Sequence, residues 1–222
     1  ASTKSDEEAA VLYQQAIDKY KKAVTIKPDS CNLLMNWGIS LQSLALIKQD
    51  KEAEVLYQQA INKYKKAMAI KPNSNNYELL MNWGISLQGL ALMKQDKEAE
   101  GLYQQAIDKY KEATAIRPDD CIVLRHWLLL SMNRSKNKTE AESKDILNEG
   151  LARAKQFHKH CGGDYNLSCY YALMQDKSEA LKLLEISLQN KEVSREFVLQ
   201  DEDWKIYSND KDFKEIINKS YE

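Results

Sequence analysis

The stretch LLMNWGISLQ, which occupies residues 33–42 and occurs again at residues 79–88, decides the fold. A second string, LYQQAI, occurs three times, at residues 12–17, 56–61 and 102–107. Prolines follow the three strings in register, and their spacing gives a period of 44 residues and then 46. The two extra residues fall within residues 74–77, where a turn can absorb them. A period of this length indicates stacked structural repeats.

Each repeat is predicted to contain two helices. Within residues 33–47 apolar side chains recur every three or four positions, as on one face of a helix. They are Leu34, Trp37, Leu41, Leu44 and Ile47. The pattern breaks at residues 48–52, where we expect Asp50 to cap a second helix. That helix should end before Pro72, because proline cannot continue an established helix. A single pair cannot bury its apolar stripe alone, whereas stacked pairs can.

Composition favours an all-α protein. The 222 residues include only 7 glycines and 3 prolines, too few for the many turns of a β-sandwich or barrel. The net charge of −1 argues against nucleic acid as a partner. No apolar run is long enough to insert into a membrane. The start has no signal-peptide core, so we expect a soluble intracellular protein: cytoplasmic, or inside a plastid or mitochondrion if this end is a processed one.

The motif resembles the tetratricopeptide family, whose consensus is W-x2-L-G-x2-Y, then A-x3-F, then P. Gly38 takes the family's Gly place, Ala60 and Tyr64 match A-x3-F, and Pro72 is the closing proline. The next repeat matches with Trp83, Gly84, Leu87, Ala106, Tyr110 and Pro118. The resemblance implies an all-α, right-handed superhelical solenoid of antiparallel helix pairs. It also implies that each glycine lets the two helices approach, with Ala60 and Ala106 facing Gly38 and Gly84. The family's period is 34 residues, so the helices should be longer here.

The resemblance covers nearly the whole chain, which we expect to be a single solenoid domain, 1–222. Residues 12–28 match a second helix without its first, and they are expected to be a capping helix or part of a longer array. In the third repeat Leu128 replaces the glycine. The predicted parts are an N-terminal capping helix (6–28), repeat 1 (31–72), repeat 2 (76–118), a divergent repeat 3 (120–161), repeat 4 (164–191) and a C-terminal cap (193–222).

First helices line a concave groove in this family, and the resemblance implies that Asn36, Asn82, His126 and Asn166 point into it. An amide carries donors and an acceptor, so such a column could bind the backbone of a peptide. Alternatively, these amides bond to their own helices. The family's lysine and arginine clamp for a C-terminal carboxylate is mostly missing. The neighbours expected on the same face are Met35, Ile39, Gln42, Met81, Ile85, Gln88 and Arg125, and the methionines could instead pack between repeats.

Catalytic chemistry is not indicated. There is no Gly-rich phosphate loop, nucleophile elbow or H-E-x-x-H motif, and no cofactor or metal is expected. The run His158-Lys159-His160-Cys161 is interpreted as a solvated helix end, because residues this close rarely share a metal. The four cysteines, Cys31, Cys121, Cys161 and Cys169, match no metal or redox spacing and are expected to be free thiols.

The leading functional prediction is a protein–protein interaction scaffold that binds a peptide or helix of a partner protein in the groove. The alternative is a structural or assembly-factor subunit built permanently into a larger complex, possibly in an organelle. An enzyme is a distant third, because a fold does not by itself prove a function. The expected partners are proteins, and no small-molecule substrate is expected.

Overall fold

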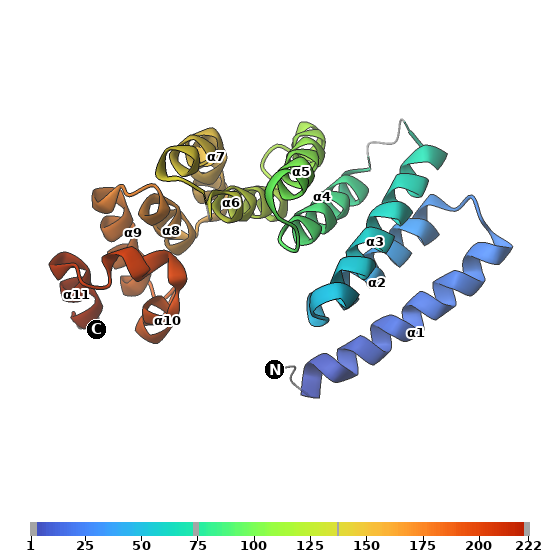
Figure 1. The fold of residues 1–222 in the computed structure, drawn as a ribbon, viewed down its shortest axis with the longest axis horizontal. Coiled ribbons are helices and arrows are strands. Elements are labelled where there is room, and N and C mark those ends of the chain that lie inside the picture. The colour runs from blue at the N-terminus through green and yellow to red at the C-terminus, as the bar shows by residue number, and fades with distance from the viewer. Residues whose placement is uncertain (1–3, 73–75, 137, 220–222) are drawn as a thin grey trace. The chain divides into compact units, whose positions relative to one another are not determined.

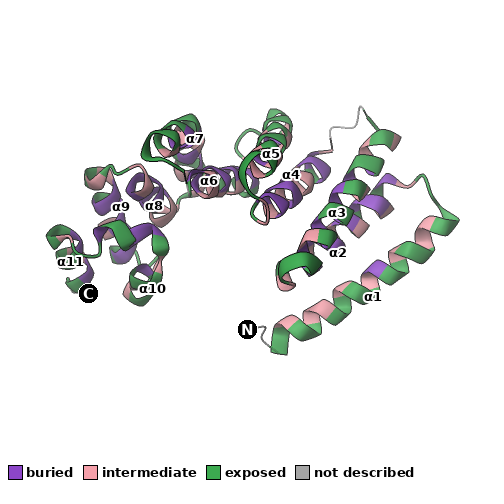
Figure 2. Cartoon of the chain, viewed as in Figure 1, coloured by how far each residue is buried: buried purple, intermediate pink, exposed green. Residues whose placement is uncertain are grey.

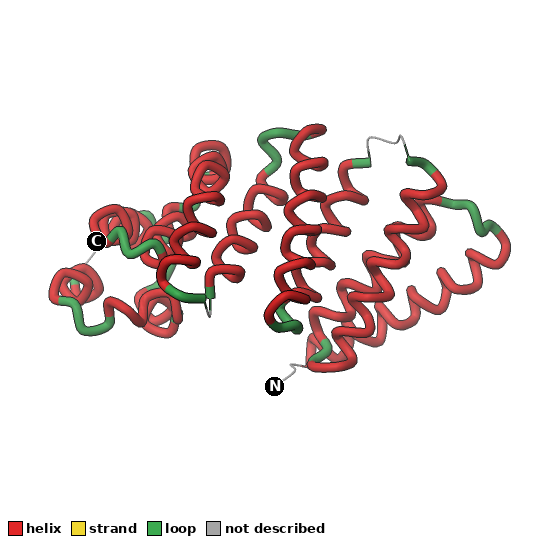
Figure 3. The backbone as a smooth tube through the Cα atoms, turned by 45° about the horizontal axis from the view of Figure 1, so that its top comes forward, coloured by secondary structure: helices red, strands yellow, loops and turns green. Residues whose placement is uncertain are grey.

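The computed structural model describes residues 4–72, 76–136 and 138–219, and these residues contain helices and loops but no strand (Figure 3). Contacts divide the chain into two compact units, unit 1 (residues 1–118) and unit 2 (residues 119–222), and each is described by itself. The predicted insertion falls partly outside the described residues, at positions 74 and 75. No helix among the described residues is long and apolar enough to cross a bilayer.

Unit 1 consists of five long helices (Figure 1). The second helix of each repeat packs on the first, so that α2 pairs with α3 and α4 with α5, while α1 packs on α2 and α3 on α4. Helices α1, α3 and α5 each end two residues before a proline, as the sequence predicts. The bounds are α1 Lys4–Ile26, α2 Cys31–Ile47, α3 Asp50–Ile70, α4 Tyr77–Ala91 and α5 Asp96–Ile116.

Unit 2 contains two further helix pairs and a short C-terminal segment. The pairs are α6 Cys121–Ser135 with α7 Glu140–Cys161, and α8 Asp164–Leu173 with α9 Lys177–Gln189. The segment contains α10 Arg195–Gln200, the 3-10 helix η1 Glu202–Tyr207 and α11 Lys211–Asn218. In this segment η1 contacts α8 and α11 contacts α9, and the ring of Trp204, 2% exposed, stacks on Phe213 with centroids 5.5 Å apart. The C-terminal segment therefore contacts both helices of the last pair.

Short polar side chains begin the first helices, whereas the second helices of repeats 1 and 2 begin differently. Ser30 and Asn76 accept hydrogen bonds from the backbone N–H groups of the third residues of α2 and α4. The prediction that Asp50 caps α3 is wrong. Asp50 is the first residue of the helix with a φ of 49°, and the capping position belongs to Gln49, whose side chain makes no capping bond.

Residues 26 positions apart meet across the first three pairs. The Lys63 Nζ atom lies 3.4 Å from the centroid of the Trp37 ring, and burial is the main cause that lowers the pKa of Lys63. The same cation–π contact recurs in the next two pairs. It joins Lys109 to Trp83 at 4.6 Å and Arg153 to Trp127 at 5.0 Å. Trp37 and Trp83 thus occupy matching surroundings, which supports the repeat prediction.

A glycine on each first helix lies against a tyrosine ring on the second. A Cβ atom placed on Gly38 would lie 2.5 Å from Tyr64, and one on Gly84 would lie 2.4 Å from Tyr110. The side chain nearest to a Cβ atom on Gly38 is therefore that of Tyr64, one helical turn beyond the predicted Ala60 on the same side of α3. The glycine is required because any side chain would overlap the ring.

Repeat 3, α6 with α7, reverses these sizes. Leu128 stands where repeats 1 and 2 have glycine, and Ala154 stands where they have tyrosine, again 26 positions later. Both are fully buried at 0% exposure and belong to one apolar cluster together with Met132. The bulk that the tyrosine supplies from the second helix comes here from the leucine of the first, which agrees with the close packing of protein interiors.

Candidate partner-binding face

Helices α2 and α4 each carry an accessible stripe along one side. On α2, Asn36 is exposed, Ile39 is half-buried and Leu46 is 69% exposed. The matching positions 46 residues later are Asn82 and Ile85 on α4 and Leu92, which directly follows α4, and α2 and α4 contact each other. We call the combined stripe the α2–α4 face, defined by Asn36, Ile39, Leu46, Asn82, Ile85 and Leu92. The two leucines are not among the residues predicted from the sequence, and Leu92 is 56% exposed.

The two asparagines of this face differ in their hydrogen bonds. The side chain of Asn36 bonds to no other described residue, so both donors and the acceptor are available. The side-chain N–H group of Asn82 donates to the Glu78 carbonyl at 2.8 Å, which leaves its oxygen as an acceptor. The local-bonding alternative therefore holds for half of the Asn82 amide and does not hold for Asn36.

Three residues predicted to line the groove are buried instead. Met35, Gln42 and Gln88 are 8%, 7% and 6% exposed, so the prediction that they line a groove is wrong. The Gln42 side-chain oxygen accepts from the Tyr64 hydroxyl at 3.1 Å and from the Ser86 hydroxyl at 2.8 Å. These glutamines tie helices together, because burying an amide is tolerated only when it is hydrogen-bonded.

The equivalent bond in repeat 2 joins Gln88 to the Tyr110 hydroxyl at 2.8 Å. Burial raises the pKa of both Tyr64 and Tyr110, so their hydroxyl groups keep the proton that they donate. Met81, also predicted for the groove, is half-buried, and its sulfur accepts from the Tyr77 hydroxyl at 3.3 Å.

The remaining predicted residues belong to unit 2. Arg125 on α6 is exposed, whereas His126 on α6 and Asn166 on α8 are half-buried, and α6 and α8 contact each other. Burial, followed by the charge of Arg125, lowers the pKa of His126 to about 4. His126 is therefore neutral at pH 7, with one ring nitrogen as a donor and the other as an acceptor. Of the four residues predicted to point into the groove, Asn36 and Asn82 lie in unit 1, and His126 and Asn166 lie in unit 2.

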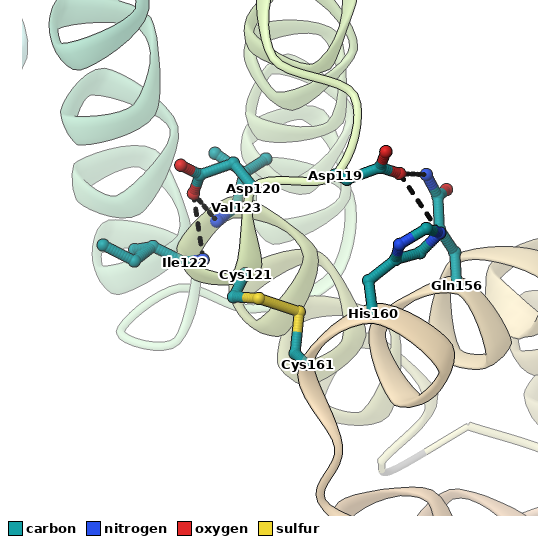
Figure 4. Close-up of a disulfide and its surroundings, with 8 residues drawn as sticks. All are labelled: Asp119, Asp120, Cys121, Ile122, Val123, Gln156, His160 and Cys161. Atoms are coloured by element: carbon teal, nitrogen blue, oxygen red, sulfur yellow. Dashed lines mark hydrogen bonds and ion pairs between the residues drawn. A yellow bond between two sulfur atoms is a disulfide. The ribbon is translucent and has the colours of Figure 1, made fainter.

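The prediction of four free thiols is wrong for two of them. Cys121 at the start of α6 and Cys161 at the end of α7 form a disulfide with Cα atoms 5.6 Å apart (Figure 4). Cys31 and Cys169 are free and buried. The disulfide also removes Cys161 as a metal ligand, and the nearby His160 Nε2 atom lies 3.3 Å from Asp119.

The disulfide occupies a position that repeat 2 closes without a covalent bond. Cys121 and Cys161 are 40 positions apart. In repeat 2 the same separation joins Tyr77 to Arg117, whose guanidinium lies 4.4 Å from the tyrosine ring centroid. In both repeats, therefore, the start of the first helix meets the end of the second, and this proximity follows from the packing of the two helices.

A buried polar cluster joins α8 to η1. Atoms of Cys169, Asp201 and Asp203 that could bind a metal lie within 4.8 Å of one another. Each carboxylate already has a protein partner: the Tyr165 hydroxyl donates to Asp201 at 2.7 Å, and the Lys136 ammonium lies 3.0 Å from Asp203. Burial, the largest cause, raises the pKa of Cys169 to about 12, so the thiol stays protonated. Because both carboxylates are engaged by partners within the chain, we assign the cluster a structural role.

An apolar pocket of about 220 Å³ lies among α10, η1 and α11. Of its lining residues Leu199 is 64% exposed, and Phe197 on α10 and Ile206 on η1 are 57% and 58% exposed. The apolar side chains that line the pocket are Val198, Leu199, Trp204, Phe213 and Ile217.

Comparisons with known proteins find no matching family model and no significantly similar curated protein. The resemblance to tetratricopeptide repeats therefore depends on the chain's own motifs.

Proposed function

We propose that the chain is a protein-interaction module that binds an extended peptide or a helix of a partner protein on the α2–α4 face. The observation that carries the proposal is the exposed amide of Asn36, which bonds to no other described residue, beside accessible apolar side chains. An amide can bind the backbone of any peptide, and the exposed Leu46 and Leu92 offer apolar contact area at matching positions of the two repeats. The tetratricopeptide resemblance supports the same proposal, because first helices bind peptides in that family.

The test isolates the chain with its native partners and then compares variants. Asn36→Ala with Asn82→Ala should lower partner affinity by about tenfold or more, since two amide contacts to a peptide are lost. The matched control is Asn62→Ala, which removes an exposed asparagine from α3. Equal loss in both variants, or no loss in either, would reject the α2–α4 face as the binding surface.

A second candidate function is a structural subunit of a larger complex. It is favoured by apolar side chains left exposed on the C-terminal segment, since Phe197, Leu199 and Ile206 are 57%, 64% and 58% exposed. Substituting these three residues by serine should release the chain from such a complex, whereas Asn36→Ala should leave the complex intact. The two sets of variants therefore separate the two functions.

A further inference from the structure

Helix α3 carries only basic charges in its C-terminal half, unlike its copies α1 and α5. We propose that lysines of α3 and α1 form a site that binds an acidic segment of a partner protein, a run of glutamate and aspartate side chains. We call this site the lysine cluster and define it by Lys21 on α1 and by Lys63 and Lys66 on α3. It lies on helices other than those of the α2–α4 face.

The internal repeat shows which charges α3 has lost. The aligned stretches are IDKYKKAVTIK at residues 17–27, INKYKKAMAIK at residues 61–71 and IDKYKEATAIR at residues 107–117. Asn62 of α3 stands where the other copies have Asp18 and Asp108, and Lys66 stands where α5 has Glu112. The stretch in α3 therefore contains four lysines and no acidic residue.

The lysines of α5 are neutralised within the helix, whereas those of α3 are not. The Nζ atom of Lys109 lies 2.6 Å from Glu112, and that of Lys111 lies 3.9 Å from Asp108. Among the residues that the structure describes, no carboxylate lies within ion-pair distance of Lys63 or Lys66. The charges of α3 are therefore left for a ligand.

The cation–π contacts of the two repeats reflect the same difference. Lys63 lies 3.4 Å from the centroid of the Trp37 ring, whereas Lys109, which is held by Glu112, lies 4.6 Å from that of Trp83. Without an acidic side chain beside it, Lys63 has only the ring as an electrostatic partner.

The three ammonium groups of the cluster act on one another. The pKa of Lys63 is lowered first by burial and then by the positive charges of Lys66 and Lys21. Lys21 has one acidic neighbour, Asp18 at 3.1 Å, so the group as a whole stays positive. Like charges held together in this way favour a shared anionic ligand.

The cluster is accessible although α3 has a helix on either side. Helix α3 packs on both α2 and α4, yet Lys66 is exposed and Lys63 is half-buried. Lys21 is exposed too, and Figure 2 shows exposed residues along both α1 and α3. Both neighbours of α3 are therefore present, and they leave the lysines open.

The chemistry of the cluster favours carboxylates on a protein segment over nucleic acid. Lysine ammonium groups are point charges that need no fixed geometry, whereas the arginine fork suits phosphate, and the cluster contains no arginine. A base would need an aromatic ring to stack on, and Lys63 already lies over the ring of Trp37.

The acidic residues of a second copy suit the cluster less well than those of a partner. Acidic residues at the starts of α3 and α5 already have cations beside them. Glu54 and Glu98 lie 2.9 Å and 3.0 Å from Lys94, and Glu52 lies 3.1 Å from Lys48. The unneutralised charge of these helices is therefore basic, and its complement is expected on another protein.

Binding can be tested with the full chain and a fluorescein-labelled peptide that contains about six consecutive glutamates. Fluorescence anisotropy should show saturable binding of one peptide per chain, and binding should weaken as salt is added. Asn62→Asp with Lys66→Glu gives α3 the residues that α5 already accommodates, and it should lower the affinity at least about tenfold. Absence of binding to the unaltered chain, or equal binding to this variant, would overturn the proposal.

A matched control separates the cluster from the net charge of the chain. Lys97→Glu with Gln105→Glu changes the net charge by the same amount at exposed positions of α5 and should leave the affinity within about twofold. A loss as large as that of the cluster variant would show that binding depends on net charge alone, which would overturn the proposal. Asn36→Ala with Asn82→Ala should leave binding unchanged, so that failure of this proposal is distinct from failure of the α2–α4 face.

The reverse exchange should create a second site. Asp108→Asn with Glu112→Lys gives α5 the residues of α3, and Lys65 then takes the place that Lys21 has in the cluster. This variant should bind two peptides per chain. A stoichiometry that stays at one would show that the lysine pattern does not make the site.

Two other occupants are outcomes of the same experiment. Sedimentation equilibrium should show the unaltered chain as a monomer, and a dimer that Asn62→Asp with Lys66→Glu dissociates would show that a second copy supplies the acidic residues. Single-stranded RNA should bind no more tightly than the peptide at equal salt. Tighter binding of RNA that this variant abolishes would show a nucleic-acid site. Either result would overturn the proposal.

Discussion

Repeats 1 and 2 differ from repeat 3 in what fills the same positions. At the pair separated by 26 residues, Gly38 and Tyr64 become Leu128 and Ala154. Four residues after the glycine, the buried Gln42, which accepts from the tyrosine, becomes Met132. Once the tyrosine hydroxyl is gone, a buried glutamine there would lose its donor, and an apolar side chain is better tolerated. The comparison teaches that the fold retains contact positions and bulk rather than residue types.

The ends of the pairs show the same substitution of one contact for another. Repeat 2 joins Tyr77 to Arg117, and repeat 3 joins Cys121 to Cys161, both across 40 positions. A cation–π contact contributes about 0.5–1 kcal/mol at an exposed site, whereas a disulfide that closes a loop of this length contributes about 4 kcal/mol. The third pair should therefore depend on its end contact far more than the second.

Of the changes proposed here, removing the disulfide should have the largest effect on stability. Cys121→Ser with Cys161→Ser should lower the free energy of unfolding of unit 2 by about 4 kcal/mol, because the unfolded chain regains the freedom that the cross-link removes. Hydrogen exchange of α6 and α7, followed by mass spectrometry, measures the change. Reductant should lower protection of the unaltered protein to the level of the variant and should not affect the variant. Protection that survives reduction unchanged would contradict the assignment.

Breaking the polar contact of repeat 1 should cost less. Gln42→Met leaves the buried Tyr64 and Ser86 hydroxyls without that acceptor and should destabilise unit 1 by about 2 kcal/mol. Adding Tyr64→Phe removes one of the unpaired hydroxyls and should recover part of the loss. Urea denaturation monitored by circular dichroism tests both changes. A double variant less stable than Gln42→Met alone would show that the tyrosine hydroxyl is not satisfied mainly by Gln42.

Weakening the end contact of repeat 2 should have a small effect. Arg117→Met keeps the aliphatic stem but removes the charge over Tyr77, and thermal unfolding should show a loss of about 0.5–1 kcal/mol. A loss that matches the removal of the disulfide would mean that the two end contacts are not comparable.

The smallest expected difference between the units is in how their stability depends on pH. All three histidines lie in unit 2, and the pKa of His126 falls from its usual value near 6.5 to about 4 on folding. Between these values the unfolded chain binds more protons, so the contribution of neutral His126 is complete above pH 6.5 and is lost as the pH falls towards 4. His126→Asn should remove this part of the acid destabilisation of unit 2. If the pH profile is unaltered by the substitution, His126 is not desolvated.

The sequence was sufficient for the helix pairs, because prolines and apolar spacing act locally. The ends of α1, α3 and α5 and the matching surroundings of Trp37 and Trp83 follow from those signals. Gln42 and Gln88 were misplaced because their polarity suggested exposure, and only the tyrosine from the other helix explains their burial. The disulfide was not predicted because it depends on how two helices pack against each other. Only the structure shows that residues 40 positions apart meet there, as Tyr77 and Arg117 do in repeat 2. Asn36 remains the predicted site residue whose surroundings best fit its proposed role.

The exchange of a large side chain between the two helices of a pair can be tested directly in repeat 1. In a Gln42→Met background, Gly38→Leu and Tyr64→Ala should each destabilise unit 1 by about 3 kcal/mol, the first by overlap and the second by leaving a cavity. Combined, they reproduce the residues of repeat 3, and urea denaturation should show that the double change costs at least about 2 kcal/mol less than the sum. Additive losses would contradict the account.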